Sequence, residues 1–184
     1  MRKSSEVVPI EGTLTIYQLL PGEANRYRRW EGIESLHRLG EKPEFKNYSK
    51  VYSMEIESTA TLDEIYMRFN TNKPPDFKGH SLSVSDIIVL DFEDRETAAY
   101  YVNDVGFVKC EEFARRHEHE LYRSANYYGY IEYLGKNGKV GETWYFKDKA
   151  TFTAEINESM EIGRPIAFYA YGKQAMRRIQ QQGR

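Results

Sequence analysis

The chain has 184 residues, with 26 Lys and Arg against 28 Asp and Glu, and therefore a formal charge of −2. This length accommodates one ordinary domain or two small ones, with a core that needs no disulfide or metal. The charge excludes a bulk polycation of the histone kind, so a nucleic-acid contact requires a local patch. The single cysteine, Cys110, excludes a disulfide framework and suits a reducing cytoplasm. Because no apolar run has the length of a signal-peptide core or a membrane span, we expect no membrane association.

Apolar spacing predicts four elements in the first third of the chain. Residues 14–19 alternate apolar and polar side chains and predict a strand. Residues 24–39 carry apolar side chains three positions apart and predict one helix. Residues 48–57 alternate again and predict a second strand. The box T-L-D-E at 61–64 predicts the start of a second helix, because Thr and Glu at this spacing satisfy each other's backbone N–H groups.

The middle of the chain is rich in predicted strands. The run I-I-V-L at 87–90 is apolar on both faces and predicts a central strand. Residues 98–107 predict two short strands or one bulged strand, and residues 110–121 a short, mostly solvated helix. Two further strands, 127–134 and 140–146, are joined by an Asn-Gly turn that is typical of a hairpin.

A helix over 148–162 and a strand over 166–171 complete the predicted elements. The order predicts an α+β fold, in which a mixed or antiparallel sheet with packed helices is followed by a smaller ββαβ unit. We therefore predict a first domain at 1–120, a small ββαβ domain at 121–172 and a basic tail at 173–184.

The sequence lacks the common motifs of catalysis and metal binding. His117 and His119 are two positions apart in a predicted helix, so their side chains point in different directions and cannot share a metal. We expect them at a solvated helix end. Cys110 precedes Glu111 and Glu112, whose charges do not favour a thiolate, and we expect a structural cysteine. The sequence thus predicts no catalytic residue, no metal site and no cofactor.

One cluster of acids leaves a weaker alternative open. Asp86, Asp91, Glu93 and Asp94 lie around the predicted central strand. Two-metal nucleases hold Mg²⁺ with acids at strand ends, so a metal-dependent nuclease is an alternative function. The same residues also fit ordinary charged turns.

Arginines next to aromatic residues are the candidate binding sites. Three arginines alternate with Tyr27 and Trp30, and two more arginine pairs follow later in the chain. Guanidinium groups beside aromatic rings suit phosphate contact with base stacking, and they equally suit docking on an acidic protein. Arginines on a solvated helix face are the structural alternative. The candidate nucleic-acid or partner-binding residues are Arg26, Arg28, Arg29, Arg115, Arg116, Tyr128, Tyr130, Arg177 and Arg178.

Tyrosines are concentrated in the predicted strand 127–134. Strand alternation places Tyr128 and Tyr130 on one face and Tyr127 and Tyr133 on the other. Because a single nearby helix cannot cover both faces, we expect some of these rings to be exposed for binding.

Five segments between Thr13 and Phe113 carry a family resemblance. They are T-L-T-I-Y-Q-L, Y-S-K-V-Y, L-D-E-I-Y-M-R-F-N, P-D-F-K-G-H-S-L-S-V-S-D-I-I-V-L and A-Y-Y-V-N-D-V-G-F. With them the chain resembles the YodL-like domain of bacterial mobile elements. The region from Leu121 to Tyr171 is similar to a small companion domain in conjugative-transposon proteins. Neither family has an established catalytic motif, so the resemblance carries over no catalytic residue.

The resemblance also implies a function. Small stand-alone proteins of such elements often counter host defence, which implies an anti-CRISPR protein that inhibits a type II RNA-guided DNA nuclease in the bacterial cytoplasm. Such nucleases hold guide RNA and DNA in positively charged channels, but a charge of −2 does not suit a DNA mimic. We therefore expect contacts to the nuclease, its guide RNA or DNA. The alternative is an accessory docking module for DNA transfer by a conjugative element.

Overall fold

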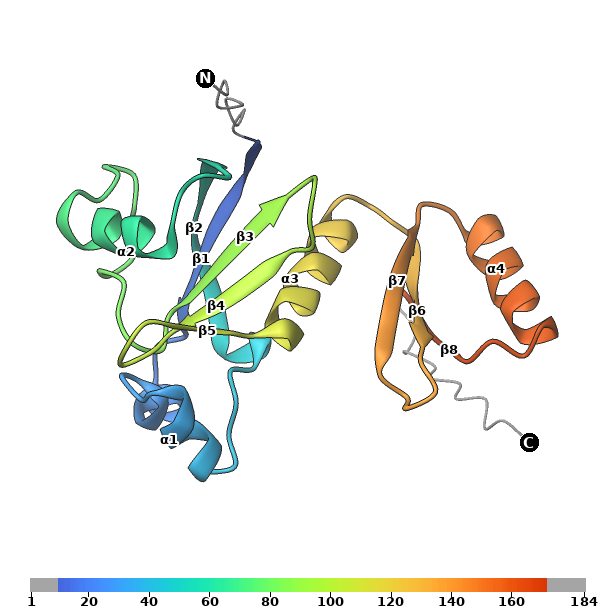
Figure 1. Cartoon of the computed structure of the whole chain (residues 1–184), viewed down its shortest axis with the longest axis horizontal. Helices are drawn as coiled ribbons and strands as arrows, with labels where there is room; N and C mark the ends of the chain where they lie inside the picture. The colour runs from blue at the N-terminus through green and yellow to red at the C-terminus, as the bar shows by residue number, and fades with distance from the viewer. Residues whose placement is uncertain (1–9, 172–184) are drawn as a thin grey trace, which may run out of the picture. The chain divides into compact units, whose positions relative to one another are not determined.

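The computed structural model describes residues 10–171, which divide after Glu118 into two compact units (Figure 1). The first unit has a five-stranded antiparallel sheet with helices, and the second has a three-stranded sheet with one helix. The predicted α+β fold with a smaller ββαβ unit is therefore confirmed.

The elements follow the chain in this order. In the first unit they are β1 (Glu11–Leu19), the 3-10 helix η1 (Glu23–Arg28), α1 (Ile33–Arg38), the 3-10 helix η2 (Phe45–Asn47), β2 (Tyr48–Glu57), α2 (Leu62–Thr71), β3 (Ile87–Phe92), β4 (Ala98–Val102) and β5 (Phe107–Lys109). Helix α3 (Glu111–Ser124) continues past the division, and the second unit has β6 (Gly129–Leu134), β7 (Val140–Phe146), α4 (Lys149–Glu161) and β8 (Ile166–Ala170).

The larger sheet has the strand order β2-β1-β3-β4-β5, with every neighbouring pair antiparallel. β1 pairs with both β2 and β3, and its residues Gly12 to Tyr17 face Phe92 to Ile87. β3 is thus the middle strand, as its apolar run predicts. For residues 98–107 the sequence predicted either two short strands or one bulged strand. The structure has two short strands, β4 and β5.

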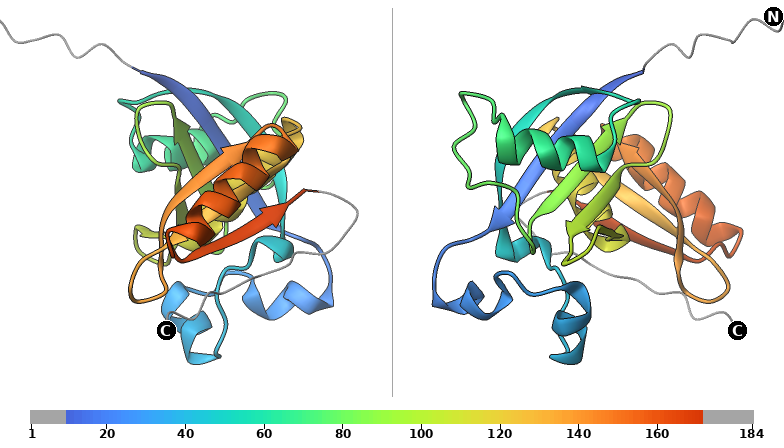
Figure 2. Two further views of the ribbon diagram at one scale, coloured as in Figure 1. Left: turned by 90° about the vertical axis from the view of Figure 1, so that its right-hand side faces the viewer. Right: turned by 60° about the vertical axis from the view of Figure 1, so that its left-hand side comes forward.

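Both faces of this sheet are covered. Ile87 and Val89 on one face join a core with residues of α1 and α3, whereas Ile88 on the other face packs with α2 and the segment that follows it. Figure 2 shows α2 lying across the strands of the sheet. A strand buried on both sides has no polar face, which explains why its sequence is apolar without alternation.

The prediction of one helix over 24–39 is wrong. The structure instead has η1 and α1, with a break between them at Trp30 and Gly32. Trp30 has a positive φ of 60°, which no helix accepts, and Gly32 has an extended backbone as the residue before α1. Trp30 is therefore not part of a buried stripe; its side chain is 71% exposed.

The prediction of a mostly solvated helix over 110–121 is also corrected. Helix α3 begins at Glu111 but extends to Ser124. His117 and His119 are both buried, at 2% and 7% exposure, because Tyr17 in the first unit and Tyr130 and Tyr145 in the second pack on them. Charged neighbours in the sequence concealed this buried face.

The second unit has the strand order β7-β6-β8, and α4 packs on one face through a core of Ile131, Tyr133, Phe152 and Ile166. On the other face the Tyr130 ring is 4% exposed and stacks on His119 and Tyr169, with ring centroids 3.9 and 4.6 Å away.

The prediction that Tyr128 and Tyr130 share a face is therefore wrong. Tyr128 packs against Phe152 of α4, because β6 begins only at Gly129 and regular alternation does not include Tyr128. The rings expected at a binding surface are buried or half-buried. None of the helices formed by residues 10–171 combines the length and apolar character needed to cross a bilayer.

Candidate functional site

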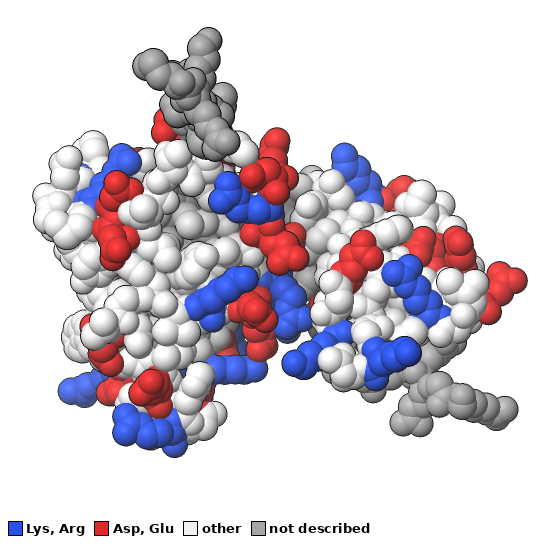
Figure 3. Space-filling model, in the orientation of Figure 1, with Lys and Arg blue, Asp and Glu red and all other residues white. Residues whose placement is uncertain are grey.

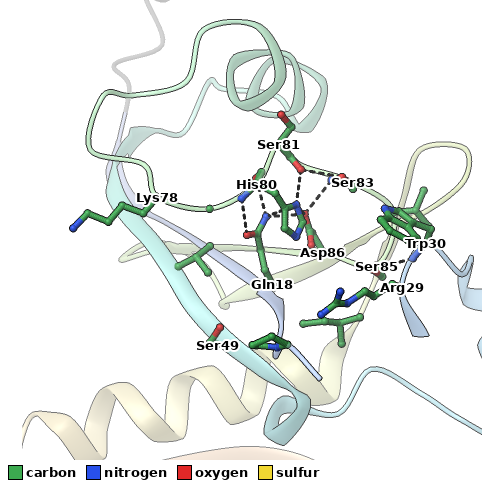
Figure 4. Close-up of a pocket in the computed structure, with 15 residues that line it drawn as sticks. Gln18, Arg29, Trp30, Ser49, Lys78, His80, Ser81, Ser83, Ser85 and Asp86 are labelled. Atoms are coloured by element: carbon green, nitrogen blue, oxygen red, sulfur yellow. Dashed lines mark hydrogen bonds and ion pairs between the residues drawn. The ribbon is translucent and has the colours of Figure 1, made fainter. Parts of the chain in front are cut away.

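A cavity of about 620 Å³ opens in the first unit. Its walls come from the end of β1, the break after η1, the start of β2 and the segment 78–86 before β3 (Figure 4). Its size lies within the usual range for small-ligand sites. All of the cavity is built by the first unit, so its geometry is defined by one sheet and the loops on it.

Gln18 ties the segment before β3 to the sheet. Its Nε2 donates to the His80 carbonyl at 2.9 Å and to Asp86 Oδ2 at 3.0 Å, and its Oε1 accepts from His80 N at 3.2 Å. The chain can approach this closely because residue 79 is glycine: a Cβ there would lie 2.6 Å from Gln18 Oε1. The buried amide therefore fixes the position of His80.

Asp86 is a buried carboxylate on the cavity wall, with 1% exposure. Besides Gln18, the backbone N–H of Ser83 donates to its Oδ2 at 3.0 Å, and His80 Nδ1 lies 3.6 Å away. Burial raises the pKa of Asp86 to about 7, against the lowering effects of His80 and of the hydrogen bonds from Ser83 and Gln18. This carboxyl therefore titrates near neutral pH.

The tautomer of His80 follows from its neighbours. Nδ1 lies 2.8 Å from the Ser81 carbonyl oxygen, which can only accept a hydrogen bond, and 3.0 Å from Gln18 Nε2, which can only donate one. The two hydrogens of Gln18 Nε2 go to the His80 carbonyl and to Asp86, so Nδ1 donates to Ser81. The Nδ1 atom therefore carries the proton of the neutral ring, and Nε2 carries none. The side chain is 59% exposed at the cavity, so Nε2 is within reach of a ligand.

Two strained residues meet at the cavity. Trp30 and Ser85 have φ values of 60° and 82°, and the Trp30 N–H donates to Ser85 Oγ at 3.4 Å. Left-handed backbone is costly for side chains other than glycine, asparagine and aspartate, and such strain is often retained at functional sites. Both residues line the cavity, and the Trp30 ring remains exposed.

The three arginines near Trp30 have different environments. Arg26 pairs with Glu23 at 3.5 Å, and Arg28 pairs with Glu41 at 2.8 Å. Arg29 lines the cavity, and in the described chain no carboxylate lies within ion-pair distance of it. Its charge is therefore available to an anionic ligand. Lys78 also lines the cavity, but Figure 4 shows its side chain pointing away from the His80 network.

The remaining predicted binding residues do not line this cavity. Arg115 and Arg116 lie on α3, half-buried and exposed respectively, and Tyr128 and Tyr130 pack within the second unit. Arg177 and Arg178 lie outside the described residues. Basic and acidic side chains are interspersed on the surface seen in Figure 3, so a local site is a better candidate than a broad charged face.

The structure supplies site residues that the binding prediction lacks: Gln18, His80 and Asp86. The sequence predicted Asp86 as part of an acidic cluster and assigned no role to His80 or Gln18. The useful signal was an Asp directly before a strand that is apolar on both faces, since such a position is buried. Gly79, just before His80, allows the loop to lie close to Gln18 of β1.

His117 and Cys110 are buried or half-buried groups of the first unit that lie outside the cavity lining. Burial lowers the pKa of His117 to about 4, and its Nδ1 lies 2.8 Å from the Tyr17 hydroxyl. Burial raises the pKa of the Cys110 thiol to about 11, which keeps it protonated and unreactive. Over residues 10–171 no three His, Cys, Asp or Glu side chains converge as a metal site.

The comparisons with known proteins give one match. The family model described as the YodL-like domain matches residues 13–113, a span that includes every residue of the cavity. No curated protein and no solved structure matches the chain.

Proposed function

The chain belongs to the family of the YodL-like domain, and we propose that it binds single-stranded nucleic acid at the Trp30 cavity and thereby inhibits a type II RNA-guided DNA nuclease. The binding step is the part that the geometry supports. The inhibited target follows from the resemblance to proteins of mobile elements. Guide RNA, or the DNA strand that it pairs with or displaces, is the nucleic acid that such an inhibitor would contact.

One observation carries the binding proposal: an exposed tryptophan ring and an unpaired arginine lie at the same cavity. Proteins that bind single strands stack bases on aromatic rings and neutralise phosphates with cations. Trp30 supplies the ring and Arg29 the cation. Their neighbours in the sequence, Arg26 and Arg28, each form an ion pair with a glutamate and so have less charge to offer.

Binding is measured by fluorescence anisotropy with labelled oligouridylate and oligothymidylate of about twelve nucleotides. We expect Trp30→Ala to weaken binding by about 1 to 3 kcal/mol, the contribution of one stacked base. The matched control is Trp144→Ala, which removes the other partly exposed tryptophan, in the second unit. Equal losses in the two variants would contradict the assignment of the cavity.

The role of Arg29 is tested by the salt dependence of the same binding. One phosphate contact to a single strand contributes about 0.7 to the slope of log Kd against log salt. We expect Arg29→Gln to lower the slope by about this amount, while the control Arg26→Gln leaves it nearly unchanged because Arg26 pairs with Glu23.

Inhibition is tested by cleavage of target DNA with a purified type II nuclease, with the protein added before or after guide loading. We expect wild-type protein to reduce cleavage and Trp30→Ala to be a weaker inhibitor. A stronger effect before guide loading would place the contact on the guide. Full cleavage by several nuclease orthologues, together with normal oligonucleotide binding, would favour the accessory role in conjugative DNA transfer.

A further inference from the structure

His80 and Asp86 form a close pair at the cavity. Their facing atoms, Nδ1 and Oδ2, lie 3.6 Å apart, and Gln18 bonds to the backbone of one residue and the carboxylate of the other. All side-chain contacts that the structure gives Asp86 are on Oδ2. In the described part of the chain no hydrogen bond engages His80 Nε2. In this pair Asp86 is buried and held by hydrogen bonds, whereas His80 is exposed and can contact a ligand.

The other ionisable groups around Asp86 keep their charge near neutral pH. Tyr48 of β2 and Tyr101 of β4 influence it from the sheet, and burial raises the pKa of both phenols far above neutrality. Arg29 stays protonated at any accessible pH, and Lys78 points away from the pair. The raised pKa of Asp86, about 7, thus places a titrating proton at the cavity, next to His80.

The charge of this pair decides how well the cavity accepts a phosphate. With neutral His80 and ionised Asp86 the pair carries a negative charge, which repels a phosphate next to Arg29. One added proton makes the pair neutral overall and, on His80 Nε2, creates a donor for a phosphate oxygen. Since the phosphate stabilises the protonated form, binding and proton uptake favour each other.

We propose that a backbone phosphate of the bound strand sits between Arg29 and His80 Nε2, and that its binding takes up one proton at the His80–Asp86 pair. This inference rests on the proposed nucleic-acid binding. The proton comes from solvent and stays on the pair while the strand is bound; no covalent bond forms or breaks. Affinity is therefore higher in weakly acidic than in weakly alkaline solution.

The test measures oligonucleotide affinity against pH with a label that does not titrate. Oligouridylate and oligothymidylate without terminal phosphates are suitable probes, because neither their bases nor their phosphodiesters titrate in this range. We expect the Kd of the wild-type chain to fall on the order of tenfold between about pH 8 and pH 6, at constant ionic strength. Calorimetry in buffers of different ionisation heat should show uptake approaching one proton.

Two nearly isosteric variants separate the roles of the pair. Asp86→Asn removes the negative charge but keeps an oxygen for Ser83 N and Gln18. We expect it to bind more tightly than the wild type at about pH 8, because the repelling charge is gone, and to have a flatter pH profile. His80→Asn keeps a donor near the Nδ1 position and removes Nε2, and we expect it to lose the tighter binding at low pH. Circular dichroism verifies that both variants are folded.

The outcomes separate this inference from the proposed function. Oligonucleotide binding with the same Kd at all pH values overturns the proton linkage and leaves nucleic-acid binding intact. A pH profile that Asp86→Asn leaves unchanged also overturns it, because the proton would then lie elsewhere. Failure to bind either oligonucleotide at any pH overturns the proposed function, and the linkage with it.

Discussion

At the level of one residue, Trp30 combines a strained backbone with an exposed aromatic ring at the cavity. Its φ of 60° is uncommon for a bulky side chain, and the hydrogen bond from its N–H to Ser85 joins it to a second residue with positive φ. A left-handed backbone costs a side chain with a Cβ about 1 to 2 kcal/mol. This strain is present at a residue whose ring is exposed and therefore does not stabilise the core.

This strain predicts an unusual order of stability for two variants. We expect Trp30→Gly to be more stable than Trp30→Ala by about 1 kcal/mol, because glycine accepts positive φ whereas alanine retains the strain. In regular helices and strands alanine is the more stabilising of the two. Urea unfolding measures the difference, and a more stable alanine variant would mean that residue 30 does not hold this backbone in solution.

At the level of elements, local sequence patterns predict structure correctly where nearby residues supply the hydrogen-bond partners of the backbone. The capping box of α2 forms as its sequence predicts: Thr61 Oγ1 accepts from Glu64 N at 3.2 Å, and Glu64 Oε2 accepts from Thr61 N at 2.8 Å. The predicted helix over 24–39 fails because a three-residue apolar spacing does not reveal that the backbone reverses at Trp30. Packing in the tertiary structure, rather than helix propensity, determines that break.

The capping box gives a prediction confined to one element. Thr61→Ala should cost about 1 kcal/mol of unfolding free energy, because the Glu64 N–H at the start of α2 loses its side-chain acceptor. Thr71→Ala is the matched control: its hydroxyl donates to the Met67 carbonyl at 2.7 Å within the same helix and caps no N–H group. Both should bind oligonucleotide normally, since neither threonine lines the cavity. A loss at Thr71 as large as that at Thr61 would contradict the capping role.

For the molecule as a whole, two buried groups of the first unit make stability depend on pH in opposite directions. His117 has a lowered pKa of about 4, so its contribution is complete above its ordinary value of 6.5 and is lost as pH falls towards 4. Asp86 has a raised pKa of about 7, so its contribution is complete below its ordinary value of 3.8 and is lost as pH rises through 7. Between these limits the two effects oppose each other.

Asp86→Asn separates the two effects. Relative to the wild type, this variant should gain about 2 kcal/mol of stability between about pH 5 and pH 7, because asparagine has no proton to lose. The control Asp94→Asn changes an exposed carboxyl that pairs with Arg95, and its difference from the wild type should stay nearly constant. Urea unfolding of the first unit over this range measures both. A difference for Asp86→Asn that does not grow with pH would place the titration on another group.

The sequence by itself determined the fold class, the buried middle strand and the order of the elements outside residues 24–39, because alternation, the capping box and the Asn-Gly turn act within a few residues. It also named Arg29, next to Trp30, as one of nine candidate binding residues from their chemical types. Only the tertiary structure decided that Arg26 and Arg28 are paired while Arg29 has no carboxylate partner among residues 10–171, since such partners depend on how loops fold back. The same holds for Gln18, His80 and Asp86, which are up to 68 residues apart in the chain. Their contact exists because β1 and β3 are neighbours in the sheet, and pairing between distant strands is a property that no local pattern contains.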